Sequence, residues 1–435
     1  MVAGLGAVTL TGATTLTTTN NNISFGSTIG NSSAQNLTFN TGSGTVSVTG
    51  AVGSGTALGT ITLTQTGGTT FSSTVNAATV TLTNTTGTIT FNGALTATTL
   101  NTAAAGYNVA INAGGTITNA VTFSNTGTVT LGDASGDSVT FTGGVTATAP
   151  SQVNLAGTVQ STNTAISLGD SDTPVVLTAN TTLSGNTSGN ITLGGTVNGG
   201  FTLTLNTTGT TTLSGVIGGS NALTSLTTNT GGTVAINTTA ITTTGAQTFG
   251  ENATLGADLT LTSNSSGNIT FGGTVESTTS ARALTINTSG TTTFSGTVGA
   301  TLPYLASVTT NSGGTTAING GSVRTTGTQT YGDAVTLGAN TTLTGTTITN
   351  SSTIGGGGYS LTISGNSVIN GAISNATSTS ISGTTSLGAS VTTTTGGQTY
   401  SGAVTLTASP TLTAPSGTIL FSSTVDGGKT LTVTN

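Results

Sequence analysis

The chain has 435 residues, yet only 3% of them are charged, against roughly 25% in a typical soluble domain. The net charge is −6, and the three basic residues, Arg282, Arg324 and Lys429, are far apart in the sequence. Binding to a phosphate backbone or to anionic lipid requires clustered Lys and Arg, so we expect no nucleic-acid partner and no electrostatic membrane attachment. The absence of His and Cys removes the commonest general base, thiolate metal sites and disulfides.

Residues 1–13, MVAGLGAVTLTGA, already have the pattern of a strand and lack the basic and long apolar segments of a secretion signal. No run in the chain approaches the roughly 20 apolar residues of a membrane helix, so we expect no membrane insertion. Residues 431–435 are strand-like as well. We therefore interpret the chain as an internal part of a longer secreted protein, located outside the cell or on a bacterial cell surface.

Short strands with alternating apolar and polar residues are predicted along the whole chain, as in Val46-Ser-Val, Ile61-Thr-Leu and Val129-Thr-Leu. Each places two apolar side chains on one face and Thr or Ser on the other, which is the period-two pattern of a half-buried strand. Gly-Gly, Asn-Gly and Ser-Gly pairs between them favour turns, because Gly adopts positive φ without strain. No window has helical periodicity, so the predicted class is all-β.

Two acidic loops interrupt these strands: LGDASGDSV contains Asp133 and Asp137, and LGDSDTP contains Asp170 and Asp172. Oxygen ligands spaced along a Gly-rich turn can hold Ca²⁺, which takes about six to eight of them, so these four residues are the candidate calcium ligands. The plainer interpretation is that each Asp caps its own turn. A third interpretation pairs Asp137 with Asp170 as glycan-cleaving carboxylates roughly 5–10 Å apart. No other cofactor is expected.

A long unit repeats in the second half of the chain. Gln247 lies in TTGAQTFGENATLGA, and Gln329, 82 residues later, lies in TTGTQTYGDAVTLGA. Gln398 opens a shorter third copy, QTYSGAVTLTA, after a further 69 residues. Repeats of this kind indicate stacked units, and 82 residues would hold about four coils of roughly 20 residues.

A second landmark is an apolar pair that begins at Ile191 in SGNITLGGTV, at Ile269 in SGNITFGGTV and at Ile419 in SGTILFSSTV. Because these contexts match, we expect the three pairs to occupy equivalent inward positions. The Asn-x-Thr triplets at Asn190 and Asn268 are expected by chance in such a composition.

Two architectures fit strands this short: one solenoid, or tandem β-sandwich (Ig-like) domains of about 80 residues. The third repeat is trimmed, which a solenoid tolerates better than a sandwich tolerates a lost strand. The chain also has no Trp and 4% aromatic residues, whereas sandwich cores usually centre on a large aromatic. We therefore predict an all-β, elongated solenoid of roughly 20-residue coils as a single continuous architecture. Residues 1–180 would form irregular coils, and residues 181–435 would hold about three copies of an ~80-residue repeat.

The Thr/Gly/Asn-rich units, such as TTTGAQTFGENATLGADLTLTS and SGNITFGGTV, resemble the repeat regions of large bacterial exoproteins, namely filamentous-haemagglutinin-like and autotransporter-type adhesins. The resemblance covers most of the chain and is strongest from about residue 177 to residue 435. It implies a right-handed parallel β-helix, secretion across an outer membrane and a role at a surface or in a matrix. The chain shows neither the secretion-signal domain nor the translocator barrel of that family.

Each repeat copy contains a Gln two residues before an aromatic ring, at Phe249, Tyr331 and Tyr400. Residues i and i+2 share a strand face, so these could form a row of sugar-stacking rings beside amide donors. We favour a structural role instead, with the ring filling a corner of the coil and the amide satisfying a turn. The exchange of Phe for Tyr suggests that the ring edge reaches water.

These observations predict a non-enzymatic structural shaft of a secreted or surface-attached bacterial adhesin or extracellular filament. Its expected partners are other copies of itself or flanking repeats, joined through the terminal coils, and a host surface, glycan or matrix. The alternative functions are a glycan-binding module and a polysaccharide-active β-helix enzyme.

Overall fold

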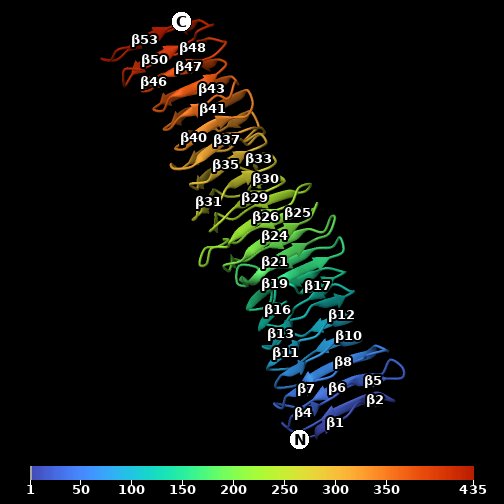
Figure 1. Ribbon diagram of the computed structural model, residues 1–435. Coiled ribbons are helices and arrows are strands. Elements are labelled where there is room, and N and C mark those ends of the chain that lie inside the picture. Colours follow the sequence, from blue (N-terminus) through green and yellow to red (C-terminus); the bar gives the residue numbers. More distant parts are fainter. Residues whose placement is uncertain (1) are drawn as a thin grey trace. The chain divides into compact units, whose positions relative to one another are not determined.

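The computed structural model describes residues 2–435, and their side chains from residue 6 onward. These residues form strands and turns and contain no helix, so no helix in this range could cross a membrane. The chain divides into two compact units, residues 1–223 and residues 224–435. Each unit is a β-solenoid of stacked coils, with about 21 residues in a typical coil (Figure 1). The change of character expected at residues 180 and 181 stays a prediction.

Each coil of unit 1 contributes strands to three faces, which we name A, B and C in chain order. Face A contains β1 (Val2–Leu5), β4 (Ile23–Phe25), β7 (Val46–Val48), β9 (Thr69–Phe71), β11 (Thr88–Phe91), β13 (Asn108–Ile111), β16 (Thr128–Leu131), the first halves of β19 (Gln152–Ser161) and β21 (Val175–Ser184), and β23 (Val197–Asn198). Face B contains β2 (Val8–Leu10), β5 (Ile29–Asn31), the first halves of β10 (Val75–Leu82) and β12 (Leu95–Thr102), β14 (Gly115–Ile117), β17 (Ser138–Phe141), the second halves of β19 and β21, and β24 (Thr202–Asn206). Face C contains β3 (Thr14–Thr17), β6 (Leu37–Asn40), β8 (Leu58–Gln65), the second halves of β10 and β12, β15 (Val121–Thr122), β18 (Val145–Ala147), β20 (Ile166–Leu168), β22 (Ile191–Leu193) and β25 (Thr210–Leu213).

Unit 2 has three faces of the same kind, which we name D, E and F. Face D contains β26 (Ser225–Thr228), β29 (Gln247–Phe249), β32 (Ile269–Phe271), β35 (Thr291–Phe294), β37 (Thr315–Ile318), β40 (Ala334–Leu337), β42 (Ile354–Gly355), β44 (Ile373–Ala376), β47 (Val391–Thr393), β50 (Thr411–Thr413) and β53 (Thr432–Thr434). Face E contains β27 (Thr233–Ile236), β30 (Asn252–Leu255), β33 (Val275–Ser277), β38 (Ser322–Arg324), the first halves of β41 (Thr341–Asn350) and β43 (Leu361–Ile369), β45 (Thr379–Ile381), β48 (Gln398–Tyr400) and β51 (Ile419–Phe421). Face F contains β28 (Ala240–Thr243), β31 (Leu259–Ser263), β34 (Ala283–Asn287), β36 (Ser307–Thr310), β39 (Gln329–Tyr331), the second halves of β41 and β43, β46 (Thr385–Leu387), β49 (Val404–Leu406) and β52 (Val425–Asp426).

All of these strand pairings are parallel, which confirms the solenoid and excludes the antiparallel sheets of tandem sandwiches. On face A, Ile89 pairs with Val109, and Val109 pairs with Val129, so one coil there takes 20 residues. On face D, Ile354 pairs with Ile373 after 19 residues, and Thr292 pairs with Thr316 after 24. The coil length therefore varies locally while the in-register pairing is kept.

The interior is filled by the inward residue of each alternating pair, stacked on its equivalent in the next coil. On face D the rings of Phe249, Phe271 and Phe294 form a continuous stack, with centroids 5.1 Å and 5.7 Å apart. All three rings are fully buried. Phe71 and Phe91 stack in the same way on face A, at 5.2 Å. Parallel in-register pairing brings identical side chains together, and stacked rings add about 0.5–1.5 kcal/mol beyond the burial of their area.

The coil corners are tightly stacked, and glycine is required where one corner lies directly on the next. A Cβ at Gly87 would lie 2.0 Å from the carbonyl oxygen of Gly67 in the preceding coil. Such a contact is shorter than any van der Waals approach, so a side chain here would push the coils apart. The Gly-rich turns of the sequence therefore serve close backbone approach as well as positive φ.

The 82-residue repeat does not hold a whole number of coils, which corrects the expected four. Starting from Gln247 on face D, successive partners are Ile269, Thr292 and Thr316, still on face D. Gln329 comes two faces later, on face F, where it pairs with Val308. The repeat thus spans three coils and two further faces. Its copies therefore match as single strands with their turns, and not as whole coils.

The apolar pairs at Ile269 and Ile419 lie on different faces, so the expectation that all three pairs occupy equivalent positions was wrong. Ile269 lies on face D and Ile419 on face E of unit 2, and Ile191 lies on face C of unit 1. The pairs at Ile191 and Ile269 do point inward and are buried. The pair at Ile419, in the last described coil, is half-buried.

A matched pair of truncations tests the stacking of the core. Phe271→Ala removes the middle ring of the face D stack and should lower the free energy of unfolding by roughly 3–5 kcal/mol, because it opens a cavity between two rings. Phe421→Ala removes a half-buried ring and should cost about half of that or less. Chemical denaturation of the two variants measures the difference, and equal losses would contradict the stacked core.

Candidate functional site

The four aspartates lie in two separate turns, each closed by its own carboxylate. Asp137 Oδ2 accepts hydrogen bonds from the backbone N–H groups of Asp133 at 2.9 Å and of Ala134 at 2.7 Å. Asp170 Oδ1 accepts from the N–H groups of Asp172 and Thr173, both at 3.0 Å. This is the turn-capping role that was the plainer interpretation of these loops. Among the described residues, no group of three or more acidic side chains is placed to hold a metal ion.

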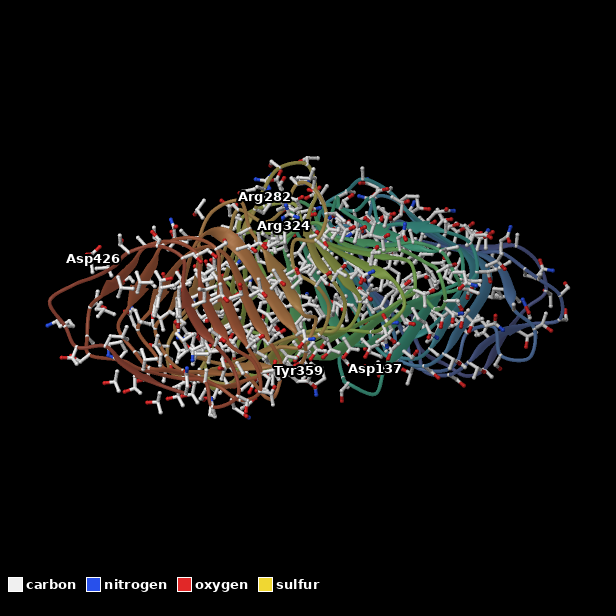
Figure 2. All side chains as sticks on the ribbon, turned by 90° about the horizontal axis from the view of Figure 1, so that it is seen from above. Asp137, Arg282, Arg324, Tyr359 and Asp426 are labelled. Carbon is white, nitrogen blue, oxygen red and sulfur yellow. The ribbon has the colours of Figure 1, made fainter. Side chains whose placement is uncertain are left out.

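The two turns do not combine into a paired-carboxylate site. The turn with Asp137 (labelled in Figure 2) connects β16 on face A to β17 on face B. The turn with Asp170 connects β20 on face C to β21 on face A. They therefore lie at different corners of the solenoid. Burial, together with the hydrogen bond and the negative charge of the neighbouring Asp137, raises the pKa of Asp133.

The Gln of each repeat copy is fully buried and joins three segments of backbone. Gln329 Nε2 donates to the carbonyl oxygen of Val323 at 3.0 Å and to that of Thr344, in the next coil, at 2.8 Å. Gln247 makes the corresponding bonds on face D, to Ile241 and Thr262. The amide thus satisfies a coil corner, as favoured from the sequence. These side chains are not available to a ligand.

The aromatic rings beside these amides do not reach water, so the interpretation of the Phe-to-Tyr exchange was wrong. Tyr331 and Tyr400 are fully buried, and burial raises the pKa of both hydroxyls. Tyr331 Oη donates to Gln329 Oε1 at 2.9 Å, and Tyr400 Oη makes the same bond to its own Gln at 3.0 Å. Where the copy has Phe249, Gln247 Oε1 is buried without a hydrogen-bond partner.

Sequence reasoning missed a recurrent role of Asn, which links each coil to the next. Asn268 Oδ1 accepts from the backbone N–H of Thr291 at 2.9 Å, and Asn190 Oδ1 accepts from that of Thr210 at 2.9 Å. The same bond, over 18 to 24 residues, is formed by Asn20, Asn22, Asn36, Asn108, Asn163, Asn180, Asn198, Asn252, Asn340 and Asn366. The signal available in the sequence is the recurrence of Asn near strand starts, of which the Asn-x-Thr triplets at Asn190 and Asn268 are a part.

Two buried carboxylates occupy matching positions of the first two repeat copies. Asp333 accepts from the N–H of Gly314 at 2.8 Å and from the hydroxyl of Thr316 at 3.2 Å. Glu251 is 3% exposed, and neither of its oxygens has a hydrogen-bond partner. Burial raises the pKa of Glu251 to about 7. Gly402 takes this position in the third copy.

A group of cationic and aromatic side chains lies at a corner of unit 2, between faces E and F. The Arg324 guanidinium lies over the ring of Tyr304, 3.8 Å from its centroid. Arg282 lies on the neighbouring loop (Figure 2), and its backbone carbonyl accepts from Ala306 at 2.8 Å. Leu302, 77% exposed, is the most exposed large apolar residue described. Two of the three cations of the chain, far apart in sequence, thus meet at one corner.

Comparison with protein-family models, with curated proteins and with solved structures finds no match in any of the three.

Exchanging Phe and Tyr between repeat copies tests the buried amide–hydroxyl pair. Tyr331→Phe should lower the free energy of unfolding by about 1–2 kcal/mol, because it leaves the Gln329 oxygen buried and unpartnered. Phe249→Tyr should raise it by up to about 1 kcal/mol, because it supplies the missing donor to Gln247. Tyr359→Phe, at a surface tyrosine that is 38% exposed, is the matched control with little change. Denaturation midpoints measure all three, and a stabilising Tyr331→Phe would refute the pairing.

The buried Glu251 predicts a pH-dependent stability. Its folded-state pKa of about 7 lies above the ordinary 4.5, so its contribution is fully present below about pH 4.5 and is lost as the pH rises through 7. The loss should be on the order of 2 kcal/mol between pH 5 and 8. Glu251→Gln should flatten this part of the stability profile, and Asp426→Asn, at an exposed carboxylate, should not. Urea denaturation across this pH range is the measurement, and an unchanged slope in Glu251→Gln would contradict the assignment.

Proposed function

We propose that this chain is a structural shaft of a secreted or surface-attached bacterial adhesin or extracellular filament. The observation that carries the proposal is the continuous bonding of each coil to the next within both units. Backbone hydrogen bonds pair the strands of all faces, and the Asn side chains add bonds at the corners. The resemblance of the Thr/Gly/Asn-rich repeats to those of large bacterial exoproteins supports the same role.

The proposed mechanism is mechanical. Parallel strands of neighbouring coils lie roughly 4.8 Å apart, so a pulling force along the coil axis loads backbone hydrogen bonds on three faces together. Stacked rings and inward Leu, Ile and Val hold the same coils from within. Outward Thr and Ser side chains keep the surface hydrated. Because only 3% of the residues are charged, salt should have little effect on the stability of the coils.

The last described coil supports association through coil ends. Val425 on face F is 38% exposed and Val433 on face D is 50% exposed, although both lie in register with buried residues of the preceding coil, Val404 and Leu412. A strand with apolar side chains and an open edge is a template for pairing with another strand. We propose that this end pairs with another copy or with flanking repeats, and that few charges oppose the contact.

The two alternatives differ in their support. A glycan-binding role is favoured by the cationic and aromatic side chains at one corner of unit 2. A polysaccharide-active enzyme gains nothing from Asp137 and Asp170, since their turns lie at different corners. The prediction that the chain is not an enzyme remains open to assay, and residues Asp133, Asp137, Asp170 and Asp172 are the ones to replace in it.

Association through the terminal coil can be tested on the purified chain. We expect light scattering and electron microscopy to show end-to-end assemblies that increase with concentration. The double variant Val425→Asp, Val433→Asp should weaken this association at least tenfold, because each charge would have to be buried between coils. The control Leu302→Asp introduces a charge at a more exposed apolar residue away from that coil and should assemble like the parent. A parent chain that stays monomeric at high concentration, or equal loss in the control, would refute association through this end.

A further inference from the structure

Three loops of successive coils converge at one corner of unit 2, where the chain passes from face E to face F. They are residues 278–282 after β33, residues 299–306 after the bridge at Val298, and residues 325–328 after β38. Loop 299–306 is the longest of the three. Arg324 ends β38 and lies over Tyr304 of that loop, and Arg282 belongs to the first loop. We name Arg282, Leu302, Tyr304 and Arg324 the arginine corner; Figure 2 labels the two arginines.

The long loop, residues 299–306, is held in place by hydrogen bonds to Glu276 of β33. Glu276 accepts from the backbone N–H groups of Ala300 at 3.1 Å and of Thr301 at 3.0 Å, and from the Thr301 hydroxyl at 3.0 Å. Leu305 is fully buried and anchors the other end. At the start of the loop Gly299 has φ +65°, and a Cβ there would lie 2.1 Å from the Arg324 carbonyl oxygen. The loop that presents Tyr304 is therefore fixed before any ligand arrives.

The cations of this corner are left unneutralised. No carboxylate among the described residues lies within ion-pair distance of either guanidinium. Glu276 lies on β33, before the first loop, and its two oxygens accept hydrogen bonds from Ala300 and Thr301 of the long loop. Arg282 Nε is buried without a hydrogen-bond partner. In a chain with nine acidic and three basic residues, two unpaired arginines at one corner indicate a site for an external anion.

The chemistry of the corner specifies the kind of anion. A guanidinium stacked over an aromatic ring keeps its edge N–H groups free, and their fork matches a carboxylate in two parallel hydrogen bonds. The first loop contains the exposed residues Thr279 and Ser280, whose side chains carry hydroxyls, and the exposed Leu302 provides an apolar contact. Carboxylate, hydroxyl and apolar contacts together suit an acidic sugar.

We propose that the arginine corner binds a carboxylate-bearing polysaccharide, with the uronate carboxylate on Arg324 and Arg282 and the sugar ring against Leu302 and the edge of Tyr304. An acidic peptide fits less well, because the strands beside the corner are already paired on both edges. β34, for example, pairs with β31 and with β36. A peptide would lack the free strand edge that gives extended chains most of their affinity. This site is additional to the shaft function and does not depend on assembly through the terminal coil.

Binding of polygalacturonate to the full chain at low salt tests the proposal. The net charge of −6 repels a polyanion as a whole, so binding requires a local cationic site. Arg324→Ala and Arg282→Ala should each weaken binding at least tenfold. Arg324→Lys keeps the charge and loses the fork, so it should weaken binding severalfold. Lys429→Ala removes the same charge at the third cation and should bind like the parent. Thermal denaturation of each variant verifies folding.

The other probes decide between ligand classes. Neutral amylose should not bind, and polyglutamate and dextran sulfate should bind at least tenfold more weakly than polygalacturonate. No binding of polygalacturonate at low salt overturns the proposal, as does an equal loss in Lys429→Ala and Arg324→Ala. Tighter binding of polyglutamate would assign the corner to an acidic peptide, and tighter binding of dextran sulfate would assign it to sulfate groups. Either result overturns the carboxylated sugar.

Discussion

The structure depends on one constraint: every coil must stay in register with the next on three faces at once. In parallel, in-register pairing each residue lies opposite the equivalent residue of the next coil. Its hydrogen-bonding partners are therefore roughly 20 residues away in the sequence but only one strand spacing away in space. Backbone groups meet this constraint directly. Asn268 and its equivalents meet it at corners, where an amide oxygen receives the N–H of the following coil. Phe271 meets it inside, between two rings of the same kind.

The same constraint explains why the sequence repeat can be out of step with the coil. Copies of the Gln-Thr-aromatic segment occur on face D at Gln247, on face F at Gln329 and on face E at Gln398. On each face the amide finds a carbonyl before it and a carbonyl one coil later, because the three corners offer the same arrangement of backbone. A strand with its turn is therefore a self-sufficient unit. A copy can fold on any of the three faces, provided that its Gln and aromatic side chains point into the core and that a coil corner and the next coil supply the carbonyls.

The fold class could be predicted from the sequence because period-two alternation and Gly-rich turns are local signals. Register could not, since coils differ in length and the three faces are interchangeable, so Ile269 and Ile419 share a context but not a face. The capping role of Asp137 and Asp170 was predictable from turn chemistry alone. The Tyr331 hydroxyl was misjudged because its partner, Gln329 Oε1, becomes available only when period two turns both side chains into the core. The arginine corner combines residues from separate coils, which no local pattern reveals.

Scarcity of charge gives the few ionisable groups distinct consequences. Most polar side chains of this chain are uncharged amides and hydroxyls, and they leave a surface with a weak electrostatic field. On such a surface a guanidinium without an ion-pair partner has a large effect on the local potential, because few other charges lie on the same surface. The buried carboxylates show the converse case. Asp333 receives two hydrogen bonds where it is buried, whereas Glu251 receives none and is held closer to its neutral form. The place of an ionisable side chain relative to a coil corner thus decides its role. Asp137 caps a turn, Glu251 is buried with a raised pKa, and Arg324 stays open to a ligand.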